Sequence, residues 1–193
     1  MEVSTIAVIG AGAIGREIAC VAMCAGYRTV LEDFSAATLE DGAAHIRKTL
    51  EDGVARGDLA IERHRAALRN LFQARRVEDA CREADLLIET SAEEMEAKLE
   101  IFTLFDKFAV PSAILASGSA SFAISELAEI TCRAEKCVGL RFSPLPRIQR
   151  LEIVRTPETS DATVQACLEA GRRMVKAVTV VREGARSRAQ SGR

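Results

Sequence analysis

Residues 6–15 read Ile-Ala-Val-Ile-Gly-Ala-Gly-Ala-Ile-Gly, and this stretch decides the fold of the 193-residue chain. A short apolar run leads into a Gly-x-Gly-x-x-Gly turn, and an apolar helical pattern follows the turn. A strand, a glycine turn and a helix in this order are the fingerprint of a dinucleotide-binding βαβ unit. The alternative is a glycine-rich turn in some other α/β protein.

Each glycine of the turn has a physical reason to be there. Gly10 permits the sharp passage from strand to helix, Gly12 lets a pyrophosphate approach the backbone, and Gly15 lets the helix lie close to the strand. The helix begins near Ala13 and Ile14, where free N–H groups and the positive end of the helix dipole would face the phosphates. We expect these five residues to bind a dinucleotide.

Asp33 ends the next strand, 18 residues beyond Gly15. A carboxylate at that place can accept hydrogen bonds from both ribose hydroxyls and would repel a 2′-phosphate. Phe34 follows, with no arginine beside it to receive such a phosphate. The sequence therefore predicts NAD as the cofactor in preference to NADP.

Strands and helices alternate along the chain, which predicts an α/β fold with a Rossmann-type, doubly wound and mostly parallel sheet. Strands are expected at 6–9, 29–32, 72–74, 86–88, 114–116, 137–142, 151–154 and 178–181. Helices are expected at 13–25, 35–54, 61–71, 77–81, from a capping box at 91–94 to 108, at 125–130 and at 160–175. The domain covers 4–182, with a helical-hairpin arm at about 35–71 and a disordered tail at 183–193.

Local signals predict where several of these helices begin and end. Ser35 and Ser160 can cap helix N-termini, and Ser91-x-x-Glu94 has the pattern of a capping box. Gly53 and Gly57 are expected to end the first helix of the arm.

Composition excludes several classes of function. The net charge of −2 gives no reason to expect nucleic acid or an anionic membrane as partner, and the apolar runs are too short to span a bilayer. The first strand starts almost at once, so no leader peptide is expected. Six cysteines without a C-x-x-C pair favour reduced thiols, a cytoplasmic location and no metal site. Cys20 and Cys24 are expected to be buried, and His45 and His64 to be solvated.

Four stretches, 6–33, 84–98, 114–121 and 138–160, make the chain similar to the NAD-binding domain of the 3-hydroxyacyl-CoA dehydrogenases. The resemblance implies that Glu93, Lys98 and Ser117 bind NAD, with Glu93 and Lys98 around its nicotinamide half. It also implies that the arm contacts an acyl-CoA substrate through Thr49 and Arg56.

The resemblance weakens where the chemistry would take place. The family reads Gly-x-His-Phe-Phe-Asn-Pro, whereas residues 139–144 read Gly-Leu-Arg-Phe-Ser-Pro. Arg141 therefore stands where the family has its general base, and an arginine does not deprotonate in a protein. Ser143 replaces the asparagine, while Glu152 keeps the place of the carboxylate that orients the base. We expect an ion pair between Arg141 and Glu152.

The loop after the strand at 114–116 departs from the family too. The family has Ser-Asn-Thr-Ser-Ser, and residues 117–121 place Ala120 where the substrate-binding serine is expected. Ser119, Arg141 and Glu152 remain the candidate catalytic residues. Thr49, Arg56 and Ser143 are the candidate substrate-binding residues.

Two functional hypotheses follow from this mixture. The first is an NAD-dependent oxidoreductase of the 3-hydroxyacyl-CoA dehydrogenase type. The second is a non-catalytic NAD-binding subunit or sensor derived from that family. The family's sequences continue into a helical domain that dimerises and closes the acyl cleft, and its motifs are not found after Val181. We therefore expect a homodimer or a partner chain, with apolar surface exposed around 145–151.

Overall fold

The computed structural model describes residues 2–143 and 148–184. Its strands are β1 (Thr5–Ile9), β2 (Arg28–Glu32), β3 (Leu71–Ala74), β4 (Leu86–Glu89), β5 (Ile114–Ser117), β6 (Cys137–Ser143), β7 (Arg150–Arg155) and β8 (Ala177–Arg182). Its α-helices are α1 (Ala13–Cys24), α2 (Ala36–Ala55), α3 (Ile61–Arg69), α4 (Val77–Cys81), α5 (Met95–Phe108), α6 (Ile124–Ala128) and α7 (Asp161–Met174).

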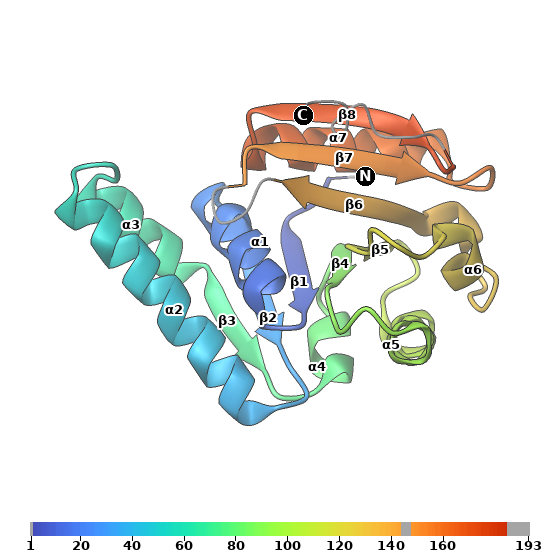
Figure 1. Cartoon of the computed structure of the whole chain (residues 1–193), viewed down its shortest axis with the longest axis horizontal. Coiled ribbons are helices and arrows are strands. Elements are labelled where there is room, and N and C mark those ends of the chain that lie inside the picture. Colours follow the sequence, from blue (N-terminus) through green and yellow to red (C-terminus); the bar gives the residue numbers. More distant parts are fainter. Residues whose placement is uncertain (1, 144–147, 185–193) are drawn as a thin grey trace.

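All the strands belong to one eight-stranded sheet in the order β3-β2-β1-β4-β5-β6-β7-β8 (Figure 1). Neighbouring strands are parallel except for β6 and β7, which form an antiparallel pair. The strand order reverses direction between β1 and β4, where an open α/β sheet leaves a crevice at its carboxyl edge. The predicted doubly wound, mostly parallel α/β sheet is confirmed.

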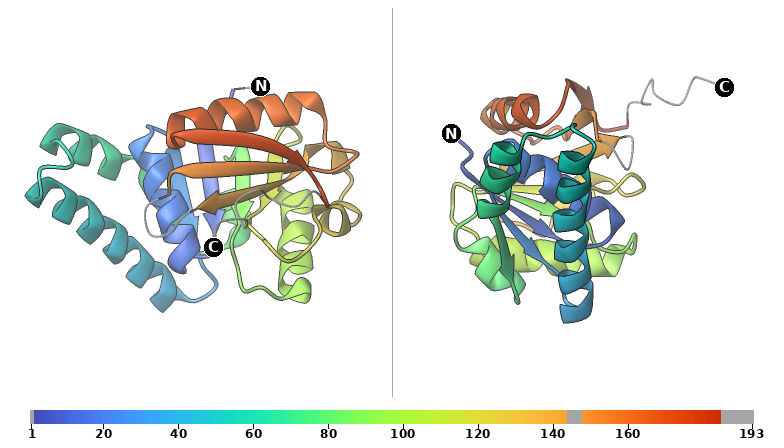
Figure 2. Two further views of the ribbon diagram at one scale, coloured as in Figure 1. Left: turned by 45° about the horizontal axis from the view of Figure 1, so that its top comes forward. Right: turned by 90° about the vertical axis from the view of Figure 1, so that its left-hand side faces the viewer.

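Successive residues of the central strands point into two different cores, as a sheet covered on both faces requires. In β1, Ile6 and Val8 pack with α1, α2 and α7, whereas Ala7 and Ile9 pack with α4, α5 and α6. The hairpin formed by α2 and α3 projects away from the sheet, and α7 lies along β7 and β8 (Figure 2). The predicted helical arm is therefore present.

The serine caps are confirmed, but one glycine signal is wrong. The hydroxyl oxygens of Ser35 and Ser160 accept hydrogen bonds from the N–H groups three residues later, at 3.2 and 3.1 Å. Gly53 does not end α2: it is buried inside that helix, where an added Cβ would meet the side chain of Leu59 at 3.5 Å. The helix ends at Ala55, and Gly57 follows with a φ of +77°.

The capping box predicted at Ser91 is wrong as well. Helix α5 begins only at Met95, and Ser91 turns back toward the end of β4. The N–H and hydroxyl of Ser91 both donate to Oε1 of Glu89, at 2.7 and 2.6 Å. A buried carboxylate two residues earlier therefore takes the serine that the local pattern assigned to the helix.

Two predictions about burial are wrong, and a third is wrong at two positions. Cys24 is exposed, and the imidazole nitrogens of His64 are buried without a hydrogen-bond partner in the described part of the chain. Ile148 and Leu151 are buried in the core beneath α7, so the expected apolar surface is absent at these two positions. Residues 145–147 of that segment, and the predicted tail from 185 onward, lie outside the described residues.

The end of the described chain is anchored to the start of helix α6. The carboxylate of Glu183, placed by the sequence in the tail, accepts hydrogen bonds from the backbone N–H groups of Ile124 and Ser125 at the start of α6. None of the helices within residues 2–143 and 148–184 is long and apolar enough to cross a bilayer.

Candidate nucleotide and substrate site

The glycine turn lies at the carboxyl edge of the sheet, between β1 and α1. Gly10 has a φ of +107°, and its N–H donates to the carbonyl of Glu32 at 2.8 Å, which ties the turn to β2. The hydroxyl of Thr90 lies within 3.0 and 3.1 Å of the carbonyls of Ile9 and Gly10. A Cβ on Gly15 would lie 1.8 Å from the Gly10 carbonyl oxygen, so the close approach of helix and strand is real.

Gly12 differs from its two partners because its missing Cβ faces open space. An added Cβ at Gly12 would meet no heavy atom within 4 Å, and its φ of −67° is open to any residue. Ala13 and Ile14 beside it are exposed. The first N–H groups of α1 therefore lie under a free surface, as a bound pyrophosphate needs.

Asp33 stands beside this surface and orders the loop around it. Its Oδ2 accepts the N–H of Ala11 at 2.9 Å, and its Oδ1 accepts the N–H of Ser35 at 2.9 Å. A carboxylate has about four acceptor positions, so each oxygen keeps one for a ribose hydroxyl. The backbone holds the carboxylate in place before any ligand arrives.

A cavity of about 520 Å³ opens next to the glycine turn and Asp33. Its lining comes from the ends of β1 and β2 and from α5 with the loop before it: Ile9, Gly10, Asp33, Phe34, Ser91, Ala92, Ala97, Glu100 and Ile101. The lining is mostly apolar, and the exposed Phe34 offers a flat aromatic face. Its size and lining suit an adenosine group whose ribose reaches Asp33.

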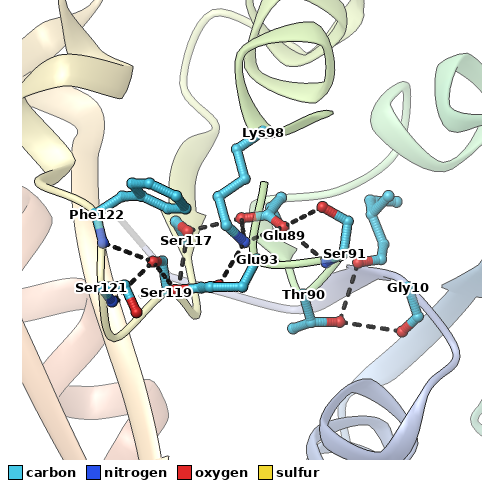
Figure 3. Close-up of polar contacts among 11 residues, drawn as sticks. Gly10, Glu89, Thr90, Ser91, Glu93, Lys98, Ser117, Ser119, Ser121 and Phe122 are labelled. Atoms are coloured by element: carbon cyan, nitrogen blue, oxygen red, sulfur yellow. Dashed lines mark hydrogen bonds and ion pairs between the residues drawn. The ribbon is translucent and has the colours of Figure 1, made fainter. Parts of the chain in front are cut away.

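A buried charge network lies at the ends of β4 and β5 (Figure 3). The Nζ of Lys98 lies 3.0 and 3.2 Å from the two carboxylate oxygens of Glu89, and both side chains are almost fully buried. Ser117 donates its hydroxyl to Oε2 of Glu89 at 2.7 Å. Lys98 also lies 3.1 Å from Oε2 of Glu93, whose side chain is 43% exposed. Lys98 and Ser117 thus hold the carboxylate of Glu89 beneath the surface, and Lys98 also holds that of Glu93. The partly exposed side chain of Glu93 is the one that a ligand can reach.

Ser119 belongs to this network, and its hydroxyl makes three hydrogen bonds there. Its hydroxyl lies 2.5 Å from Oε1 of Glu93, and its oxygen accepts the N–H groups of Ser121 and Phe122 at 3.2 and 3.0 Å. Burial works to raise the pKa of Glu93, but the hydrogen bonds from Ser119, Lys98 and the Ser121 N–H lower it to about 2. In this arrangement the hydroxyl hydrogen of Ser119 points to Glu93, and the catalytic role of Ser119 stays a prediction.

Arg141 and Glu152 form the expected ion pair. The two residues lie directly opposite each other on β6 and β7, and Nη1 of Arg141 lies 3.3 Å from Oε1 of Glu152. Nε of Arg141 donates to the carbonyl of Ser119 at 3.3 Å, which brings the guanidinium next to the β5 loop. The structure therefore unites these three candidates at one end of the sheet.

The predicted substrate-binding residues are not brought together. Thr49 and Arg56 lie on the projecting arm, where Arg56 is exposed and pairs with Asp58 at 2.9 Å. Ser143 is exposed at the end of β6. No described contact joins Ser143 to the arm.

The structure also reveals carboxylates that the motifs did not single out. Glu89 anchors the buried network, and Glu32 ends β2 with 1% of its surface exposed. Burial, and then the charges of Asp33 and Glu78, raise the pKa of Glu32 to about 7. The only sequence signal was a glutamate at the end of a buried strand, a pattern that needs a known sheet before it can be interpreted.

Comparison with known proteins agrees with this geometry. The family model described as 3-hydroxyacyl-CoA dehydrogenase, NAD binding domain, matches residues 5–184. The chain belongs to this family. NAD is the cofactor of its binding domain, and the open Gly12 backbone with the fixed Asp33 carboxylate fits that cofactor.

Individual relatives point the same way. The chain is 36% identical to a 3-hydroxybutyryl-CoA dehydrogenase of Bradyrhizobium diazoefficiens, over 92% of this chain and 61% of the relative. It is 30% identical to a probable 3-hydroxybutyryl-CoA dehydrogenase of Bacillus subtilis, over 95% of this chain and 64% of the relative. The crystal structure of M. tuberculosis FadB2 superposes with a TM-score of 0.90 at 29% identity, over 96% of this chain and 66% of the other. The chain thus spans less than two thirds of the length of these curated relatives.

Proposed function

We propose that this chain is the NAD-binding part of an NAD-dependent oxidoreductase that acts on a CH–OH group of a 3-hydroxyacyl-CoA or a related hydroxy substrate, as in fatty-acid metabolism. The observation that carries the proposal is the open backbone at Gly12 beside the fixed carboxylate of Asp33. The names of the relatives supply the substrate class, and the predicted cytoplasmic location stays a prediction.

In this proposal the dinucleotide lies across the carboxyl edge of the sheet. Asp33 binds the adenosine ribose, the N–H groups around Gly12 to Ile14 bind the pyrophosphate, and the nicotinamide lies toward Glu93 and the Ser117 loop. Bound NAD supplies the hydride acceptor. Lys98 and Ser117 position Glu93 and the loop, and Arg141 and Glu152 face the place where a substrate would react.

Proton transfer is the step for which this chain is least equipped. A guanidinium does not deprotonate in a protein, and the hydroxyl of Ser119 already donates to Glu93. Among the described residues next to Arg141, the carboxylate of Glu152 could accept a proton. The states of Arg141 and Ser119 also favour the second candidate function, an NAD-binding subunit or sensor without turnover.

Oxidation of NADH by acetoacetyl-CoA separates the two candidates. The experiment compares the wild type with Arg141→His, which introduces a titratable base, and with Arg172→His on the exposed face of α7 as a control. Turnover that rises by about 10²-fold or more in Arg141→His alone supports the oxidoreductase with a modified proton site. NADH binding without turnover in all three proteins speaks against a 3-hydroxyacyl-CoA substrate and favours the binding subunit.

We also propose that the protein assembles with a second chain. A homodimer or a partner chain would complete the substrate side of the cleft. Light scattering of the purified chain, alone and with NADH, measures whether such a dimer forms.

A further inference from the structure

Arg141, Glu152 and Thr179 lie next to one another on adjacent strands and form a polar row on one face of the sheet. Helix α6 covers this face as far as Gly139, where an added Cβ would meet Ile124 at 3.0 Å. Two residues further along β6, Arg141 lies opposite Glu152, and Glu152 lies opposite Thr179 of β8. The helix cover has ended at this row, so its side chains reach solvent.

The contacts of Arg141 leave part of its guanidinium free. Nε donates to the Ser119 carbonyl and Nη1 to Glu152, each at 3.3 Å, which is long for a charge-assisted bond. Nη2 has no hydrogen-bond partner among the described residues, and the side chain is 30% exposed. An arginine paired with a single carboxylate frequently forms two short parallel bonds with it, and Arg141 does not. Arg141 instead presents an unused donor edge to the site.

The position of the free Nη2 of Arg141 indicates which ligand it would contact. The pyrophosphate has its own binding surface at Gly12, at the β1 end of the crevice. Arg141 touches Ser119, in the loop after β5, where the nicotinamide half of a dinucleotide is expected. A group bound by Arg141 would therefore belong to the substrate, close to the reacting carbon.

We infer that Arg141 binds the carboxylate of a small 3-oxo or 3-hydroxy acid, so that the substrate of this site carries a negative charge next to the reacting group. The inference rests on the proposed function because it needs NAD at the same edge. Arginine suits this task, since its planar donors match the two oxygens of a carboxylate. Glu152 limits the affinity because it competes for Nη1.

Isothermal titration with a matched pair of ligands tests this inference. Acetoacetate and its neutral analogue acetoacetamide are each titrated into the protein saturated with NAD⁺, where no hydride transfer can occur because both components are oxidised. We expect acetoacetate to bind at least tenfold more tightly than acetoacetamide. Equal affinities for the two ligands, or binding of neither, would overturn the inference and leave the NAD site intact.

Variants of the ion pair sharpen the test. Arg141→Gln should remove the preference for acetoacetate and leave NAD⁺ affinity within about threefold, while Arg141→Lys should keep part of the preference. Glu152→Gln should strengthen acetoacetate binding, because Nη1 then becomes available. Arg172→Gln on α7 should change nothing.

Two further results would contradict the assignment. A loss of NAD⁺ affinity of tenfold or more in Arg141→Gln would mean that the guanidinium serves the coenzyme and not a substrate. Failure of NAD⁺ to bind the wild type would overturn the proposed function, and this inference with it.

Discussion

The carbonyl oxygen of Gly10 lies where a side chain on Gly15 would have to begin, 1.8 Å from the ideal Cβ position. The oxygen belongs to the backbone of the turn and cannot rotate away. Gly15→Ala should therefore destabilise the protein by about 3 kcal/mol or more, because the helix must move off the strand. Urea unfolding of the variant measures this loss. A Gly15→Ala protein as stable as the wild type would mean that α1 lies farther from β1 than described.

Buried charge predicts a second large effect. Lys98→Met leaves the carboxylate of Glu89 without its cation in a fully buried position, which should cost about 3–5 kcal/mol of unfolding free energy. Arg56→Met breaks the exposed pair with Asp58 and should cost no more than about 1 kcal/mol. Chemical denaturation of both variants provides the comparison. Similar losses for the two would show that Glu89 is not buried as described.

Adding Glu89→Gln to Lys98→Met should recover part of the lost stability. The double variant no longer buries an uncompensated charge, although the hydrogen bonds from Ser91 and Ser117 are weakened. Additive losses in the cycle would contradict direct pairing of the two side chains.

Glu32 predicts a pH dependence of stability. Its pKa is raised from an ordinary 4.5 to about 7, so the folded state holds a proton that the unfolded state releases at lower pH. Stability should therefore fall as the pH rises from about 4.5 to 7 and then level off, with a total of at most about 3 kcal/mol. In Glu32→Gln this fall should disappear.

Thermal melts between pH 5 and pH 8 measure the effect. Glu40→Gln, which changes an exposed glutamate of α2, is the control and should follow the wild type. Parallel curves for the wild type and Glu32→Gln would show that Glu32 is ionised throughout and that its burial costs nothing.

Asp33 predicts the choice of coenzyme. Asp33→Ala removes a ribose acceptor and the two loop bonds from the N–H groups of Ala11 and Ser35. Affinity for NADH should fall roughly 10–100-fold, and discrimination against NADPH should narrow, because the carboxylate that repels a 2′-phosphate is gone. Fluorescence titrations with both nucleotides decide this. Unchanged NADH affinity and unchanged discrimination would place the ribose elsewhere.

Features that depend on residues close together in the sequence were predicted correctly more often than features that depend on distant residues. The glycine turn, the caps at Ser35 and Ser160 and the helix Val77–Cys81 depend on residues close in sequence, and the structure has them as predicted. The Arg141–Glu152 pair also followed, because the resemblance had already placed the two positions together.

The failures involve partners that are distant or hidden. Ser91 was assigned to a helix because nothing in its local pattern shows that Glu89 is buried below it. The occupation of Ser119 by Glu93 joins two loops 26 residues apart and cannot be read from either loop alone. The role of a carboxylate at the end of a buried strand depends on which side chains of neighbouring strands and loops lie next to it.

The proposed function depends on a dinucleotide that lies on the open backbone at Gly12. The most direct measurement is the dissociation constant of NADH for the wild type, for Gly12→Ala and for Gly53→Ala, a buried helical glycine of α2 where an added Cβ meets only ordinary contacts. Gly12→Ala should fold normally, because its Cβ meets nothing, yet bind NADH at least tenfold more weakly, because that Cβ fills the place of the pyrophosphate. Gly53→Ala should bind like the wild type. A wild type that does not bind NADH, or a Gly12→Ala protein that binds it equally well, would show that the dinucleotide does not lie at Gly12.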